Sequence, residues 1–119
     1  MRISFSLGSV NEEAKKLCEI TKMALDEAIK ICKPGVAYRQ IGGIINDIAD
    51  EHKLGVIKEY VGHGVGRAFH SAPTITHNRN NGPGFMKQGQ TFTIEPMLVQ
   101  VRVMSHLCLL NLCICLRMI

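Results

Sequence analysis

Residues 62–96 read GHGVGRAFHSAPTITHNRNNGPGFMKQGQTFTIEP, and the rest of the chain is organised around them. The segment places two imidazoles, His63 and His70, seven residues apart among glycines, and it ends on a carboxylate, Glu95, within a strand-like apolar run. Glycines at positions 62, 64 and 66 disfavour a helix here. They also let the backbone bend and approach a ligand closely, because glycine has no Cβ.

The imidazole and the carboxylate suggest a metal site. A nitrogen ligand from His63 and an oxygen ligand from Glu95 form the mixed set that Mn, Co, Zn or Fe(II) accept. Against this, a lone histidine in a glycine-rich loop is more often a hydrogen-bonded structural residue, and GHGVG alone is a weak pattern. Glu95 favours the site, because a carboxylate within TFTIEP would be costly to bury without a partner. We therefore predict that His63 and Glu95 ligate a divalent metal.

Length and composition indicate one small globular domain. The chain has 119 residues, of which 46% are apolar and 20% charged, so it is too short for two cores and too apolar for general disorder. The net charge of +4 comes from scattered basic residues, and only 5% of residues are aromatic. Nucleic-acid binding is therefore not expected, because it requires clustered basic residues interleaved with aromatic ones.

Cysteine usage and the N-terminus bear on the compartment. The five cysteines form an odd set without a CxxC pair, which predicts free thiols rather than disulfides or a structural zinc site. The opening MRISFSLG is too short for a signal peptide and a poor transit peptide. The cytoplasm is the predicted compartment, with an organelle left open for a longer form of the protein.

Two helices are predicted before the central stretch. Asn11 followed by Glu12 and Glu13 is a helix start, because the Asn side chain can cap free backbone N–H groups and acidic residues favour the positive end of the helix dipole. An apolar stripe extends this helix to about residue 31, where Lys-Pro-Gly stops it. A second helix is expected over residues 37–52. Three acidic residues on this helix could present carboxylates to a metal, but they lie opposite its isoleucine stripe and are predicted to be a solvated face: Asp47, Asp50 and Glu51.

Strands are predicted at residues 3–7, 56–61 and 90–97, with a loop over residues 73–87. In the last strand Thr91, Thr93 and Glu95 share one face. Residues 99–119 are strongly apolar and contain no acidic residue, yet polar residues interrupt them, so no membrane span is expected. This tail could form a pair of strands or a helix. We predict a domain over residues 1–98 and an atypical apolar tail over 99–119.

The motifs GHGVGRAFHSAP and TFTIEPML together resemble the methionine aminopeptidases of type 1, and the helical segments NEEAKKL and KPGVAYRQIG fit the same family. The resemblance extends over about residues 5–98 and favours this family over its relatives prolidase and aminopeptidase P. It implies the pita-bread fold, an α/β (α+β) architecture of two pseudo-symmetric halves around a curved antiparallel sheet. This chain resembles most of the second half, with two helices packed on the sheet.

The resemblance also implies roles for individual residues. His63 and Glu95 resemble metal ligands, His70 resembles a catalytic histidine that contacts the scissile amide, and Phe69 resembles a wall of the methionine pocket. The implied reaction is removal of N-terminal methionine from nascent polypeptides, with the ribosome as a further partner. The implied cofactors are two divalent ions, Co, Mn, Fe or Zn.

The family's metal centre uses two aspartates, one histidine and two glutamates, of which this chain matches only His63 and Glu95. We therefore predict that the chain alone is inactive, as a methionine aminopeptidase truncated at both ends. The alternative is a non-catalytic isoform or binding module that docks on a full-length partner or on the ribosome. A third interpretation, that the motifs match by coincidence in a small structural protein, requires several matches to arise together by chance.

Overall fold

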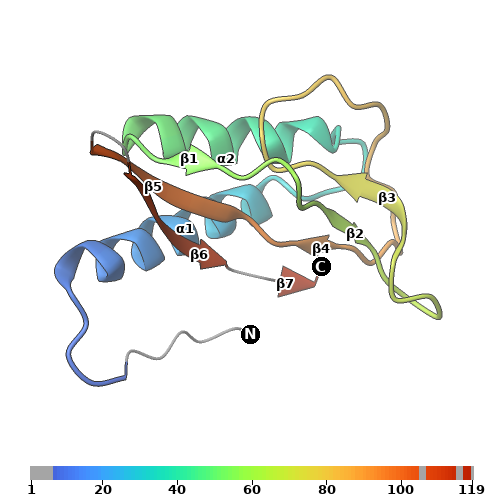
Figure 1. Cartoon of the computed structure of the whole chain (residues 1–119). Coiled ribbons are helices and arrows are strands. Elements are labelled where there is room, and N and C mark those ends of the chain that lie inside the picture. The colour runs from blue at the N-terminus through green and yellow to red at the C-terminus, as the bar shows by residue number, and fades with distance from the viewer. Residues whose placement is uncertain (1–6, 105–106, 115–116, 119) are drawn as a thin grey trace.

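The computed structural model describes the backbone of residues 7–104, 107–114 and 117–118, and the side chains of residues 7–100. Within these residues there are two helices and seven strands, shown in Figure 1. Their bounds are α1 Glu12–Lys30, α2 Arg39–Glu51, β1 Gly55–Val56, β2 Gly62–Gly64, β3 Ser71–Ile75, β4 Thr93–Ile94, β5 Met97–Met104, β6 Leu107–Ile114 and β7 Arg117–Met118.

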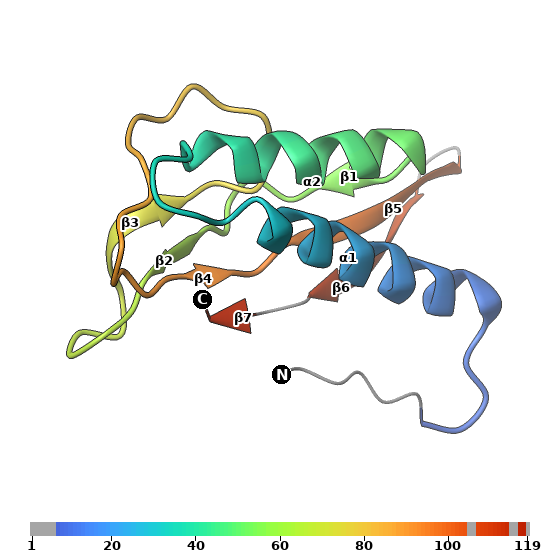
Figure 2. The same cartoon turned by 180° about the vertical axis from the view of Figure 1, so that it is seen from behind.

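The strands form three small antiparallel sheets, in the orders β1-β5-β6, β2-β3 and β4-β7. An isolated bridge between Gly64 and Phe92 connects the β2–β3 pair to the chain just before β4. Both helices pack on the same side of the strands, as the view from behind shows (Figure 2). The strands β2, β3 and β4 gather at one end of the molecule (Figure 1).

Helix α1 begins and ends close to the predicted positions. The Asn11 side chain accepts a hydrogen bond of 2.7 Å from the Ala14 N–H, and Glu12 and Glu13 occupy the first turn. The cap satisfies a free backbone N–H group at the helix N-terminus, and the two carboxylates balance the positive end of the helix dipole. The helix ends at Lys30, before the Lys-Pro-Gly stop. Its buried stripe is Leu17, Ile20, Thr21, Ala24, Leu25 and Ala28.

Helix α2 is also confirmed, although it begins two residues later than predicted. Ala37 pairs with Phe85 in an isolated bridge, and the Tyr38 N–H donates to the Gly84 carbonyl. Ala37 is therefore held in a bridge to Phe85, and the regular helix begins only after Tyr38. The acidic face of α2 is solvent-exposed as predicted, and Asp47 and Asp50 both form ion pairs with Arg79 from the 78–84 loop.

The core lies between the two helices and the strands. Its fully buried members come from both layers, and the largest apolar ones are Ile41 and Ile45 of α2, Ile75 of β3, Ile94 of β4 and Leu98 of β5. Burying an isoleucine or leucine side chain contributes about 1.5–3 kcal/mol. Because β3, β4 and β5 each contribute to this core, the core also positions the polar residues beside them.

The predicted strand over residues 56–61 is wrong for most of its length, since β1 contains only Gly55 and Val56. The reason lies in its partner strand. Val56 is paired with Leu98, and the Ile57 N–H donates to the Met97 carbonyl at 3.0 Å. The next hydrogen-bonded pair of this antiparallel ladder would be Glu59 with Glu95, but the Glu95 N–H donates to the His77 Nε2 instead, so the ladder stops there.

The predicted loop over residues 73–87 is wrong at its start, because β3 extends to Ile75 as the antiparallel partner of β2. The predicted strand 90–97 is interrupted: β4 ends at Ile94, and β5 begins at Met97. Of the two alternatives for the tail, strands are observed in β5 and β6, which pair along their whole lengths. The predicted strand 3–7 lies almost wholly outside the described residues.

Two further findings concern membrane spans and thiols. Among the described residues, no helix has the length and hydropathy that crossing a bilayer requires. Cys18 and Cys32, the cysteines whose side chains are described, are not in disulfides, as predicted, and burial raises the pKa of the Cys32 thiol to about 11. The Cys32 Sγ donates to the Ala28 carbonyl at 3.3 Å, so this thiol satisfies a carbonyl in the last turn of α1.

Candidate metal centre

His63 and Glu95 lie side by side, although 32 positions separate them in the sequence. His63 is the central residue of β2, and Glu95 follows β4 directly. The His63 Nε2 is 3.5 Å from the Glu95 Oε1, and the two side chains are 14% and 16% exposed. The pair is therefore largely shielded from water but open on one side. The structure brings these two predicted ligands together, while their role in metal binding stays a prediction.

The hydrogen bonds of His63 leave one ring nitrogen free to bind a cation. Its Nδ1 lies 3.1 Å from the Gly64 carbonyl oxygen, which can only accept, so Nδ1 carries the proton. A histidine ligand commonly donates one ring N–H to such a carbonyl and coordinates through the other nitrogen. In neutral His63 the Nε2 lone pair then faces the Glu95 carboxylate, and a positive charge between them would stabilise both.

The separation of the two atoms fits a shared ion. Nitrogen and oxygen ligands lie about 2.0–2.2 Å from a divalent metal, so two ligands at tetrahedral or octahedral angles are about 3.0–3.4 Å apart. The observed 3.5 Å is close to that range. The same distance also suits an ion pair between protonated His63 and Glu95, so metal titration distinguishes the two.

Two glycines of β2 let the neighbouring backbones approach closely. A Cβ on Gly62 would lie 2.2 Å from the Thr93 carbonyl oxygen, and a Cβ on Gly64 would lie 2.1 Å from that of Ala72. Real Cβ atoms do not approach so near, so any other residue would push β2 away from β4 or β3. The glycines flanking His63 are therefore required to bring it to Glu95.

His70 and Phe69 lie beside the pair, on the connection from β2 to β3. The His70 and His63 rings have centroids 4.2 Å apart, and the Phe69 ring lies 5.5 Å from His63 and 4.5 Å from His70. Both side chains are exposed, Phe69 to 71%. The sequence-predicted site residues thus form one cluster at the exposed end of the β2–β3 pair.

Thr93 links the two predicted ligands, a role that the sequence alone did not reveal. Its hydroxyl accepts a hydrogen bond of 3.0 Å from the His63 backbone N–H and donates one of 2.8 Å to the Glu95 Oε1. The side chain is 4% exposed, so these bonds are shielded from water. The alternation that places Thr93 and Glu95 on one face was the available signal, but it did not single out Thr93 over Thr91.

Replacing Thr93 with valine is expected to weaken Mn²⁺ binding by about 10–100-fold, because supporting residues of a metal site typically contribute that much. Valine has nearly the same shape but removes the donor to Glu95 and the acceptor for His63. Isothermal titration with Mn²⁺ measures the change. Thr93→Ser is the matched control, since it keeps the hydroxyl and should bind nearly as well as the unchanged chain. Equal affinity of the valine and serine variants would contradict this role.

A second residue missed in the sequence is His77, which follows β3 and is 1% exposed. Its Nε2 accepts a hydrogen bond of 3.0 Å from the Glu95 backbone N–H. Burial lowers the pKa of His77 to about 4, and the backbone of Tyr60 and the charge of Glu95 partly oppose the shift. No local pattern marks this residue, because its partner lies 18 positions away and is met only when β3 and β4 both pack against β2.

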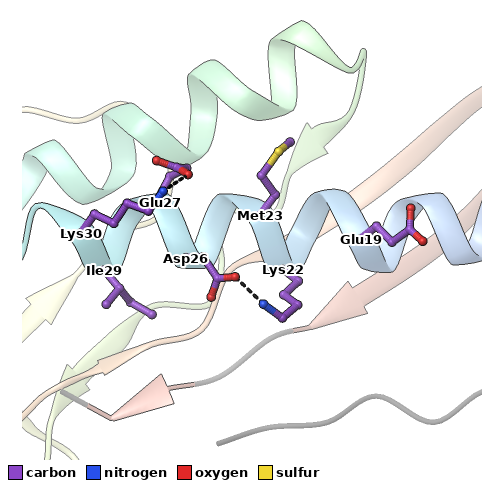
Figure 3. Close-up of a pocket in the computed structure, with 7 residues that line it drawn as sticks. All are labelled: Glu19, Lys22, Met23, Asp26, Glu27, Ile29 and Lys30. Carbon is purple, nitrogen blue, oxygen red and sulfur yellow. Dashed lines mark hydrogen bonds and ion pairs between the residues drawn. The ribbon is translucent and has the colours of Figure 1, made fainter.

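A shallow depression on the outer side of α1 lies away from this cluster (Figure 3). Four of its charged side chains pair with one another along the helix, Lys22 with Asp26 and Lys30 with Glu27. These pairs are spaced three or four residues apart and neutralise each other, as on many exposed helix faces. Glu19 is the remaining charged residue of the lining and has no ion-pair partner there. A single exposed carboxylate does not select a ligand.

Comparison with known proteins identifies relatives of the chain. Residues 1–107 match the profile of metallopeptidase family M24. Methionine aminopeptidase 1D, chloroplastic/mitochondrial, of Arabidopsis thaliana is 58% identical over 80% of this chain and 27% of its own length. Methionine aminopeptidase 1A of the same plant is 48% identical over 80% of this chain and 24% of its own length. The chain thus spans about a quarter of the length of these relatives.

Solved structures agree with the predicted fold. Methionine aminopeptidase from Rickettsia prowazekii matches 93% of this chain with a TM-score of 0.79 and 28% identity, and the match covers 50% of that protein. Prolidase from Pyrococcus furiosus matches 96% of this chain with a TM-score of 0.77 and 26% identity, over 31% of its length. The pita-bread prediction is confirmed, and a coincidental match of motifs is excluded. His63 of β2 and Glu95 after β4 meet beside the rings of Phe69 and His70. This chain belongs to metallopeptidase family M24.

Proposed function

We propose that this chain supplies one histidine and one carboxylate to the metal centre of a methionine aminopeptidase, and that it does not hydrolyse methionyl peptides by itself. The observation that carries the proposal is the 3.5 Å approach of the His63 Nε2 to the Glu95 carboxylate. The proton on Nδ1 leaves that Nε2 available to a metal. Identity of 58% to a plant methionine aminopeptidase supports the choice of substrate.

The residues of the cluster have distinct parts in this proposal. His63 and Glu95 would hold a divalent ion such as Co, Mn, Fe or Zn, which acidifies a bound water and stabilises developing negative charge. His70 can donate a hydrogen bond to the amide of the bond being cleaved, since its side chain is exposed next to His63. The exposed Phe69 ring offers an apolar wall for a methionine side chain.

Inactivity of the chain alone follows from the number of ligands. Among the residues whose side chains are described, no three His, Cys, Asp or Glu residues gather into a group that could hold a metal. His63 and Glu95 therefore stand as a pair, whereas the related enzymes are expected to use five ligands for two ions. Two ligands with a single negative charge do not balance two divalent cations.

A graft tests this function together with the predicted inactivity. Residues 62–96 would replace the equivalent segment of the methionine aminopeptidase from Thermotoga maritima, a structure 35% identical to this chain with a TM-score of 0.73. The graft is expected to release methionine from a Met-Ala-Ser peptide with Mn²⁺ or Co²⁺, because it joins His63 and Glu95 to the remaining ligands. The isolated chain should release none under the same conditions.

The control for the graft is the same protein carrying His63→Ala, which should lose methionine release while staying folded by circular dichroism. A folded graft without activity would contradict the proposed role of the segment. Methionine release by the isolated chain, abolished by His63→Ala, would contradict the predicted inactivity.

The proposal extends to organisation and partners. Residues 1–98 would be part of a methionine aminopeptidase catalytic domain, and residues 99–119 an atypical apolar tail, although β5 continues across that boundary. The substrates would be the N-termini of nascent polypeptides, met at the ribosome. The cytoplasm stays the compartment predicted from the sequence, while the relative named chloroplastic/mitochondrial supports an organelle for a longer form.

A further inference from the structure

The chain between β4 and β5 is held by a side chain instead of a neighbouring strand. β4 ends at Ile94 and β5 begins at Met97, so Glu95 and Pro96 interrupt the strand. Pro96 has no N–H to satisfy, but Glu95 has one, and in a continuous strand it would bond to a backbone carbonyl. Here it donates to the His77 Nε2 at 3.0 Å. The imidazole therefore takes the place of a strand partner at this break.

The hydrogen bond from the Glu95 N–H determines which ring nitrogen of His77 carries the proton. A backbone N–H can only donate, so Nε2 must accept, and the proton of the neutral ring lies on Nδ1. The residue is 1% exposed, and its Nδ1 makes no hydrogen bond of normal geometry, although the nearby Tyr60 backbone favours the proton on the ring. The lowered pKa of His77 agrees with a neutral ring. Leaving a buried polar atom unpaired costs about 1–3 kcal/mol, a cost that an apolar residue would avoid.

The benefit of the imidazole is its effect on Glu95. The backbone of Glu95 is held by His77, and its carboxylate is held by the Thr93 hydroxyl at 2.8 Å. Because both the backbone N–H and the carboxylate of Glu95 are held, the carboxylate stays directed at the His63 Nε2. A free Glu95 backbone next to a strand break could rotate and turn the side chain away.

We propose that His77 is a positioning residue, which holds the Glu95 backbone so that its carboxylate faces His63 and the metal that the two would share. This inference rests on the proposed function. His77 contacts neither substrate nor metal itself. It acts through the Glu95 amide, as outer residues of metal sites act through their ligands.

The test compares two substitutions of His77. His77→Gln keeps an acceptor near the position of Nε2, and His77→Phe keeps an aromatic ring but has no acceptor. The phenylalanine variant is expected to lose hydrogen-exchange protection of the Glu95 amide, followed by NMR, and to bind Mn²⁺ about 10–100-fold more weakly. The glutamine variant should recover most of both properties. His52→Phe, which removes a partly buried imidazole at the end of α2, is the matched control and should change neither.

Urea denaturation of each variant separates positioning from stability. If His77 is purely structural, both His77 variants should have a lower unfolding midpoint. Their folded fraction would still keep its Mn²⁺ affinity and the protection of the Glu95 amide. This result would overturn the inference. If His77→Phe does not fold, the glutamine variant decides: loss of Glu95 protection despite the retained acceptor overturns the inference. Absence of Glu95-dependent Mn²⁺ binding in the unchanged chain overturns the proposed function, whereas amide exchange still decides whether His77 holds Glu95.

Discussion

Replacing Glu95 with glutamine is expected to abolish the binding of Mn²⁺ to this chain. Glutamine keeps the shape of the side chain and can still accept the hydrogen bond from Thr93, but it removes the negative charge that faces His63. A neutral amide oxygen is a weaker ligand for these cations than a carboxylate. The loss of Mn²⁺ affinity should be larger than the factor of about 10–100 that is expected when a supporting residue is replaced. Isothermal titration measures it directly.

The control for this experiment is Glu51→Gln. Glu51 is an exposed carboxylate at the end of α2, so the substitution makes the same change in net charge far from His63 in the sequence and in a different element. Its Mn²⁺ affinity should equal that of the unchanged chain. Equal affinities of the Glu95 and Glu51 variants would mean that the contact between His63 and Glu95 is an ion pair and not a metal site.

The second large effect is on stability, and it has opposite signs at two adjacent glycines of α2. Alanine is a better helix former than glycine by about 0.8–1.0 kcal/mol. A Cβ on Gly43 meets nothing within 4 Å, so Gly43→Ala should stabilise the protein by about that amount. A Cβ on Gly42 would lie 2.2 Å from the Asn78 carbonyl oxygen and 2.6 Å from that of Thr76. Gly42→Ala should therefore destabilise the protein by about 1–3 kcal/mol.

Urea denaturation of the two variants measures both changes, and stabilisation by both substitutions would contradict the close approach of α2 to residues 76–78. The approach also matters for the candidate site. Residues 76 and 78 flank His77, so a shift of this backbone would move the imidazole away from the Glu95 amide. We expect Gly42→Ala, and not Gly43→Ala, to reduce Mn²⁺ affinity together with stability.

The helices show how far local sequence determines structure. Asn11 and the acidic residues after it define the start of α1, and the isoleucine stripe of α2 defines its buried face. These signals act within a few residues of one another, through capping, the helix dipole and a period of 3.6 residues. For the same reason the solvated face of Asp47 and Asp50 was predictable, although its partner Arg79 was not.

Strand boundaries depended on partners that no local pattern reveals. The short length of β1 follows from its partner, because the Glu95 N–H that would continue the ladder donates to the His77 Nε2 instead. The extent of β3 results from its pairing with β2, in which Thr74 lies opposite His63. A strand is stabilised by hydrogen bonds to residues distant in the sequence, so its ends are determined by what lies across from it.

The sequence by itself determined the chemistry of the candidate site: an imidazole and a carboxylate in the motifs of a known family, with glycines that permit close approach. Only the tertiary structure decided how these groups are held. It placed the His63 Nε2 at 3.5 Å from Glu95, joined the two through Thr93, and set His77 against the Glu95 amide. The physical reason is that a residue's chemical type is local information. The hydrogen bond from Glu95 to His77, which follow β4 and β3, exists only when the whole core packs these strands together.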